Sequence, residues 1–332
     1  MMKRAILLCD GDRFDSVFPE HLKREIEKDW VLSKKRYRSG DIGNEDFSDV
    51  EAIFSTWGMP VLTENEIKTN FPSLKYLFYA AGTVQAFARP YLNLGIRVFS
   101  AWQANAVPVA EFSVAEILLA TKGFFALYPR TKKESRPDMI RVKRGYKGNY
   151  GAKIGILGDG AIGSLVINEL LRHKLDIYVF SITMSEERAR ELGVRLASLD
   201  EIFEECDVIS NHLANNEQTQ GILNRRLIEK MRPYSTFINT GRGAQVDEAA
   251  LADKLASDNT ISAVLDVTFP EPPEADSPLL SLDNVTLTPH IAGSDGLEVE
   301  RMTQYMIDEY HRIASGEPPL YEVNLAMLDK MA

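Results

Sequence analysis

The sequence has few cysteines, no long apolar run and no excess of positive charge. Its 332 residues include two cysteines, Cys9 and Cys206, each in or beside an apolar segment. We therefore expect buried, reduced thiols in a cytoplasmic protein and not a disulfide scaffold. No stretch has the length and apolar character of a transmembrane helix. The net charge of −10 argues against nucleic acid or an anionic membrane as a partner.

Other signals are absent as well. The chain has no repeat at a fixed period and no low-complexity segment. No His, Cys, Asp or Glu grouping has metal-ligand spacing, so no metal is expected, and no Ser or Cys stands in a nucleophile elbow. Apolar residues make up 45% and charged residues 26%, which is typical of a soluble globular protein. The length allows two domains.

The chain is organised around a glycine motif, GDGAIG, at residues 158–163. A short apolar run at 153–157 precedes it, and apolar residues at helical spacing follow it, so strand, turn and helix are predicted. Gly158 would allow the tight turn, Gly160 the approach of a pyrophosphate, and Gly163 close packing of helix on strand. The helix amino terminus would offer N–H groups to phosphate. The pattern predicts dinucleotide binding; the alternative is a glycine-rich loop of any α/β protein.

The first hundred residues alternate between predicted strands and helices, which indicates a small domain with a parallel sheet. Thr63 is the predicted N-cap of a helix, and Glu66 completes a capping box. The longest apolar helical pattern runs over 107–128, with Pro108 in its first turn. We interpret this helix as buried, between domains or at a subunit interface. The basic segment 130–150 is interpreted as a surface connection.

From residue 153 onward the alternation is regular and predicts a doubly wound parallel sheet. The predicted strands are 153–157, 176–181, 207–213, 235–240, 261–267 and 285–289. The predicted helices are 161–173, 185–192, 199–205, 224–231, 247–256 and 295–314. In such a fold, chemistry gathers at the carboxyl ends of the strands.

Three candidate catalytic residues follow predicted strands. His290 stands in a turn, and histidine titrates near neutral pH, as a general acid/base requires. Glu271 has proline on both sides, and a carboxylate beside a histidine fixes its tautomer. Arg242 has glycine on both sides and is suited to bind a substrate carboxylate. The alternatives are a structural histidine and a surface ion pair. Together with a dinucleotide, the three describe hydride transfer to or from a hydroxy acid.

With the glycine motif and these three residues, the chain resembles the D-isomer-specific 2-hydroxyacid dehydrogenase family, which includes phosphoglycerate dehydrogenases and glyoxylate/hydroxypyruvate reductases. The resemblance covers most of residues 50–315 and is specific as a combination of motifs. The matching segments are 104–111, 158–163, 231–243, 265–272 and 288–293.

The resemblance implies a role for each matching residue. His290 would be the general acid/base, Glu271 its hydrogen-bonded partner, and Arg242 the residue that binds the substrate carboxylate. The implied cofactor-binding residues are Gly158, Gly160, Ala161, Ile162, Gly163, Ser181, Thr240 and Asp266. The implied substrate-binding residues are Ala81, Gly82 and Thr83, with Trp57 either in the pocket or in the core. The active site would lie in the cleft between two Rossmann-like domains.

Three departures from the family pattern affect specificity. Ser181 stands where the family has its NAD-selecting acid, so either NAD or NADP is expected. Thr83, Val84 and Gln85 replace the usual glycine and acid or amide of the substrate loop. Ala214 replaces a common proline.

The resemblance also implies the domain division and the partners. A substrate-binding domain would take residues 1–104 and 315–332, and an NAD(P)-binding domain 105–314. The partners would be a small 2-ketoacid or 2-hydroxyacid and a second copy of the chain, with the long helix supporting the homodimer. The alternative is a dinucleotide-sensing module like the C-terminal binding protein corepressors, which share the fold and bind peptides.

Overall fold

The computed structural model describes residues 3–328, except the side chains of Lys132 and Pro137. The chain forms two compact units. The first takes the residues up to Asn105 and those from Ser294 onward, and the second takes Ala106–Gly293. Each unit is an α/β structure around its own largely parallel sheet, which confirms the predicted fold class. That the active site lies in a cleft between the units stays a prediction.

The first unit contains a six-stranded sheet in the order β13-β5-β4-β3-β1-β2. Strands β1 to β5 run parallel in the order 2-1-3-4-5, and β13 pairs antiparallel with β5 at one edge. This is the flavodoxin-like version of a doubly wound sheet. Its strands are β1 (Lys3–Leu8), β2 (Trp30–Tyr37), β3 (Val50–Ser55), β4 (Tyr76–Tyr79), β5 (Arg97–Ser100) and β13 (Glu322–Val323). Its helices are α1 (Phe14–Val17), α2 (Glu20–Ile26), α3 (Glu64–Asn70), α4 (Ala88–Asn93), α13 (Val299–Ala314) and α14 (Leu325–Leu328).

The predicted capping box is present at the start of α3. The Thr63 side chain accepts a hydrogen bond from the Glu66 N–H at 3.3 Å, and the Glu66 carboxylate accepts one from the Thr63 N–H at 2.8 Å. Two of the N–H groups that a helix start leaves without partners are thereby satisfied.

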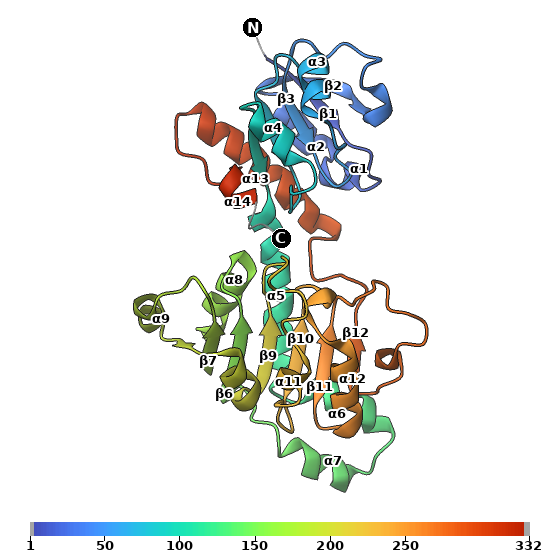
Figure 1. Ribbon diagram of the computed structural model, residues 1–332, viewed down its shortest axis with the longest axis vertical. Coiled ribbons are helices and arrows are strands. Elements are labelled where there is room, and N and C mark those ends of the chain that lie inside the picture. Colours follow the sequence, from blue (N-terminus) through green and yellow to red (C-terminus); the bar gives the residue numbers. More distant parts are fainter. Residues whose placement is uncertain (1–2, 329–332) are drawn as a thin grey trace. The chain divides into compact units, whose positions relative to one another are not determined.

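The structure corrects the predicted boundary at residue 314, because α13 belongs to the first unit. Val299, Met302 and Met306 of this helix are buried in the core built around β1 to β5. Figure 1 shows the helix, in red, against the blue and cyan elements of that unit. The apolar face of α13 packs on the core of the first unit, whereas the division implied by the resemblance gave that unit only the residues after 314.

The second unit contains a seven-stranded parallel sheet in the order β12-β11-β10-β9-β6-β7-β8. The strands β7, β6, β9, β10, β11 and β12 can be followed side by side in Figure 1. Strand order reverses between β6 and β9, and this switch point is where such sheets bind ligands. The strands are β6 (Tyr150–Leu157), β7 (Lys174–Phe180), β8 (Arg195–Leu196), β9 (Val208–Asn211), β10 (Thr236–Asn239), β11 (Ser262–Leu265) and β12 (Val285–Leu287). The helices are α5 (Trp102–Ala120, shared with the first unit), α6 (Phe124–Leu127), α7 (Arg136–Lys143), α8 (Ala161–Leu170), α9 (Glu186–Leu192), α10 (Leu199–Glu205), α11 (Arg225–Ile228) and α12 (Glu248–Ser257).

The helix predicted over 107–128 is wrong in its bounds. Helix α5 begins at Trp102 and contains Pro108 in its interior, since the Asn105 N–H already donates to the Ala101 carbonyl. It ends at Ala120, and Gly123 with φ of +71° separates it from α6. The basic connection contains α7, which Ser135 caps. Among residues 3–328, no helix is long and apolar enough to cross a membrane.

One acid of α5 is buried in the second unit. Glu116 is 6% exposed, and its Oε2 has no hydrogen-bond partner among the described residues. Burial, and to a lesser degree the carboxylate of Asp266, raises the pKa of Glu116 to about 8. The folded chain therefore keeps this carboxyl neutral at pH 7, because burial penalises the charged form and the Asp266 carboxylate repels it.

We predict that Glu116→Gln makes the fold more stable at alkaline pH. As pH rises from the ordinary value of 4.5 toward about 8, the unfolded chain loses this proton while the folded chain keeps it. The wild type should lose about 1.4 kcal/mol of unfolding free energy per pH unit over that range through this group, and the variant should not. Denaturant unfolding at pH 5 to 8.5 measures the difference, with the exposed Glu111→Gln as the control. Parallel pH profiles for Glu116→Gln and wild type would contradict it.

Candidate active site in the second unit

The glycine motif has the geometry of a diphosphate cradle. Gly158 has φ of +94°, and a Cβ there would lie 2.7 Å from the His212 carbonyl oxygen. A Cβ on Gly163 would lie 1.9 Å from the Gly158 oxygen, so helix and turn are in contact. A Cβ on Gly160 would meet no atom within 4 Å. The cradle is thus closed at Gly158 and Gly163 and open at Gly160, where α8 begins with Ala161 and Ile162. These residues fit a dinucleotide, whose phosphates would meet the N–H groups of the α8 amino terminus.

Asp266 holds the loop that carries His290. It follows β11 and is 2% exposed. Its Oδ1 accepts hydrogen bonds from the Thr288 hydroxyl at 2.6 Å and the Ile291 N–H at 2.7 Å, and its Oδ2 accepts one from the Ala292 N–H at 3.0 Å. These bonds use three of the roughly four acceptor positions of a carboxylate. The role of Asp266 in cofactor binding stays a prediction, and the described contacts make it a positioning residue.

His290 and Glu271 form a hydrogen-bonded pair. His290 Nδ1 lies 2.6 Å from Glu271 Oε1, and the two side chains are 47% and 41% exposed. His290 has φ of +56°, a conformation that residues other than glycine rarely adopt. Such residues persist only where their surroundings hold them, which the bonds of Asp266 do here. Because Nδ1 is hydrogen-bonded to Glu271, Nε2 is the ring nitrogen that would exchange a proton with a substrate.

Arg242 forms no ion pair with any of the residues that the structure describes. Its Nη1 donates to the Gly241 carbonyl at 2.8 Å, and no carboxylate of residues 3–328 lies within 4.0 Å of its guanidinium. The flanking glycines have a packing role: a Cβ on Gly243 would lie 2.1 Å from the Thr268 carbonyl carbon, and one on Gly241 would lie 2.9 Å from Asn211 Nδ2. The remaining donors of Arg242 are available to an anion.

The other strand-end histidine is structural. His212 Nε2 lies 2.9 Å from the Ser210 hydroxyl, and Nδ1 lies 3.5 Å from the Thr240 hydroxyl, which also contacts Ser113 at 3.1 Å. Burial lowers the pKa of His212 to about 4, so the ring is neutral at pH 7. Thr240, a predicted cofactor residue, is thus part of a buried hydroxyl and imidazole network.

Ser181, where the family acid is missing, bonds to the glycine motif. Its hydroxyl donates to Asp159 Oδ1 at 2.6 Å. Asp159 lies beside a cavity of about 290 Å³ that Ser164, Thr183 and Arg188 also line. Asp159 is not among the predicted site residues, although an acid inside the glycine motif is a visible signal. Glu248 is not among them either; its Oε1 accepts from the Phe269 N–H at 2.7 Å and so holds the segment before Glu271.

The predicted substrate residues belong to the first unit. Ala81 is buried, and the carbonyls of Ala81 and Gly82 both accept from the Ser100 hydroxyl. Thr83 Oγ1 accepts from the Gln85 N–H at 3.4 Å. Trp57 is partly buried against the core, with the Arg13 guanidinium 5.1 Å from its ring centroid. The roles of these residues in substrate binding stay predictions.

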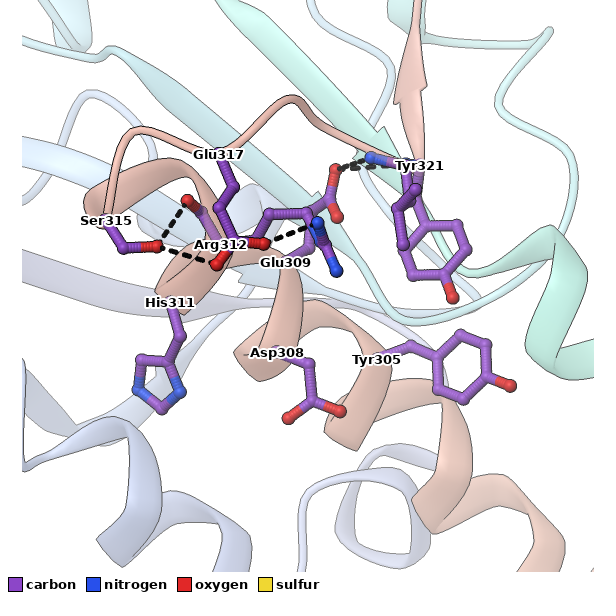
Figure 2. A pocket seen from close by; sticks show the side chains of 9 residues that line it. Tyr305, Asp308, Glu309, His311, Arg312, Ser315, Glu317 and Tyr321 are labelled. Carbon is purple, nitrogen blue, oxygen red and sulfur yellow. Dashed lines mark hydrogen bonds and ion pairs between the residues drawn. The ribbon is translucent and has the colours of Figure 1, made fainter.

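A cavity of about 450 Å³ in the first unit contains none of the predicted site residues. Figure 2 shows that it lies between the carboxyl-terminal turns of α13 and the segment 315–321, which follows this helix. Glu309 Oε1 accepts from the N–H groups of Leu320 and Tyr321 at 2.8 and 2.9 Å, and Arg312 Nη1 pairs with Glu317 at 2.6 Å. These bonds hold the segment 315–321 against α13, so the residues of this cavity have a structural role.

We predict that Asp266→Asn destabilises the second unit and loosens the His290 loop. In asparagine an NH2 group replaces one carboxylate oxygen, so it would face one of the backbone N–H groups that now donate to Asp266. A buried donor left without an acceptor lowers the free energy of unfolding by about 1–3 kcal/mol. Thr288→Val is the matched control, because it removes a single bond and should cost about 0.5–1.5 kcal/mol. Denaturant unfolding measures both. An Asp266→Asn variant as stable as wild type would show that the carboxylate does not hold the loop.

Comparison with known proteins identifies a family for this chain. Residues 114–292 match the family model of the D-isomer specific 2-hydroxyacid dehydrogenase NAD binding domain. The D-3-phosphoglycerate dehydrogenase of Archaeoglobus fulgidus is 31% identical over 237 residues, which are 71% of this chain and 44% of that protein. The enzyme of that name from Escherichia coli is 32% identical over 238 residues, 70% of this chain and 57% of that protein. The chain therefore spans about half the length of these relatives.

A solved structure shares the fold over nearly the whole chain. It is a phosphoglycerate oxidoreductase from Rhizobium etli, with a TM-score of 0.81 at 21% identity, covering 98% of this chain and 99% of that one. The matched domain supports a nicotinamide dinucleotide as the cofactor, in keeping with the cradle at residues 158–163. The chain belongs to the D-isomer specific 2-hydroxyacid dehydrogenase family.

Proposed function

We propose that the chain is an NAD(P)-dependent D-2-hydroxyacid dehydrogenase that interconverts a 2-hydroxy acid and a 2-ketoacid. The observation that carries the proposal is the 2.6 Å bond between His290 and Glu271, in a loop that Asp266 holds. Arg242 follows another strand of the same parallel sheet. The carboxyl ends of parallel strands meet at one edge, so an acid/base pair and the Arg242 guanidinium serve the same region.

Each of the three residues has a defined task in the proposed reduction. Arg242 binds the substrate carboxylate and orients the neighbouring carbonyl. His290 donates the Nε2 proton to the carbonyl oxygen, while Nδ1 stays bonded to Glu271. The Glu271 carboxylate fixes the orientation and the tautomer of the ring through its contact with Nδ1. In the oxidation the same ring accepts the hydroxyl proton.

The dinucleotide, when bound, supplies or accepts a hydride at nicotinamide C4. Gly158, Gly160 and Gly163 would hold its diphosphate, and Thr240 and Asp266 lie at the ends of the strands across the switch point from the motif.

The substrate class follows from Arg242, which requires a carboxylate next to the reacting carbon. The relatives are named D-3-phosphoglycerate dehydrogenases, so 3-phosphohydroxypyruvate is the first compound to test. Glyoxylate, hydroxypyruvate, pyruvate and phenylpyruvate complete the panel. The sensing module is not favoured, because the relatives carry the names of dehydrogenases. Tight dinucleotide binding without turnover of any 2-ketoacid would reverse that preference. Dimer formation through α5 stays a prediction.

We predict that His290→Gln lowers kcat about 10²- to 10⁴-fold on the best substrate of the panel, because general acid/base catalysis contributes about that much. Oxidation of NADH and NADPH, followed by absorbance, measures it. The control is His173→Gln, which removes an exposed histidine outside the site. Full activity in His290→Gln would overturn the assignment of this residue.

We predict that Arg242→Lys raises the KM for the ketoacid by about 10- to 100-fold, since lysine keeps the charge and loses the two-pronged contact with a carboxylate. Dinucleotide affinity should not change, and this separates substrate binding from damage to the cofactor site. A KM equal to that of the wild type would show that Arg242 does not bind the carboxylate.

A further inference from the structure

The carboxyl end of β7 holds a carboxylate that comes from another part of the chain. Ser181 follows β7, and its hydroxyl donates to Asp159 Oδ1 at 2.6 Å. The Thr183 hydroxyl lies 3.0 Å from Oδ1 and 3.2 Å from Oδ2 of Asp159. The Ser181 oxygen in turn accepts the Thr183 N–H at 3.0 Å and the Met184 N–H at 2.8 Å. Two hydroxyls, of which that of Ser181 is held by backbone N–H groups, therefore fix Asp159 over the end of β7.

This is the position at which dinucleotide-binding folds place an acid for the adenosine ribose. That acid ends the second strand of the sheet and accepts the ribose 2′-hydroxyl. Here β7 is the strand next to β6, and Ser181 occupies the position. A longer acidic side chain at 181 would reach the space that Asp159 now occupies, because Asp159 Oδ1 is one hydrogen bond from the serine oxygen.

The surroundings of Asp159 suit an adenosine. A cavity of about 290 Å³ lies beside it, lined also by Ser164, Thr183 and Arg188. Ile182, 87% exposed, offers an apolar surface next to Ser181. Arg188 is the cation that lines this cavity. Its charge is partly neutralised, because Nη1 lies 3.0 Å from Glu191 Oε2. A 2′-hydroxyl finds an acceptor here, whereas a 2′-phosphate meets a carboxylate of like charge.

We propose that Asp159 selects NAD(H) over NADP(H), in place of the acid that position 181 lacks. The inference rests on the proposed dehydrogenase function and names the cofactor of that site. Asp159 Oδ2 accepts the ribose 2′-hydroxyl, and the same carboxylate repels a 2′-phosphate, which carries nearly two negative charges at neutral pH. At a separation of about 4 Å near a protein surface, this repulsion is worth roughly tenfold or more in affinity.

The test is a binding measurement, independent of turnover. Dissociation constants for NADH and NADPH are determined by fluorescence titration of the full chain. The wild type should bind NADH at least about tenfold more tightly, and Asp159→Asn should reduce that ratio by roughly tenfold. The control is Asp176→Asn, which removes an equal charge from an exposed position near the start of β7 and should leave the ratio unchanged.

A double variant separates the loss of charge from local damage. Asp159→Ser combined with Ser181→Asp moves the carboxylate to the usual position and should restore the preference for NADH, while Asp159→Ser alone should not. Equal affinities in the wild type, or an unchanged ratio in Asp159→Asn, would overturn the inference and leave the dehydrogenase assignment standing. A wild type that binds neither dinucleotide would overturn both.

Discussion

The candidate active site depends on one buried carboxylate, Asp266. The loop after β12 has no regular structure to hold it, and His290 adopts a left-handed backbone conformation within it. Three hydrogen bonds from this loop converge on Asp266, whose own position is fixed by the buried strand β11. The sheet thereby fixes the position of the His290 imidazole, and its hydrogen bond with Glu271 forms at a defined place. Without that carboxylate, His290 and Glu271 would be two half-exposed side chains on separate loops.

Asp266 and Glu248 both position loops of the candidate site, and the buried carboxyl groups of the second unit differ in the partners they have. Asp266 is compensated by three donors, and Glu248 by the Phe269 N–H. Glu116 has a carboxyl oxygen without a partner among the described residues, and it meets the charge of Asp266, so it stays protonated at neutral pH. The neutral Glu116 carboxyl therefore adds no negative charge beside Asp266 at pH 7.

The parts of the fold that depend on local sequence were predictable. The glycine motif between an apolar run and an amphipathic stretch predicted β6, its turn and α8, and Thr63 with Glu66 predicted the start of α3. The predictions failed where distant residues decide. Helix α5 starts before Pro108 because tertiary packing outweighs a local preference for proline in the first turn. The unit to which α13 belongs depends on the core that accepts Met302 and Met306, and chain order says nothing about that.

Asp159 shows the same limit at the level of a single residue. The glycine motif at 158–163 specifies its glycines and accepts any residue between them, because the turn requires only a particular backbone geometry. A free position next to Gly158 can nevertheless reach the end of the neighbouring strand, and here Ser181 and Thr183 receive its side chain. The chemistry of the ribose site requires a carboxylate at a point in space and not at a point in the sequence. An absent acid at position 181 therefore does not by itself predict a phosphate-binding site, and it is the hydrogen bonds at that strand end that carry the information.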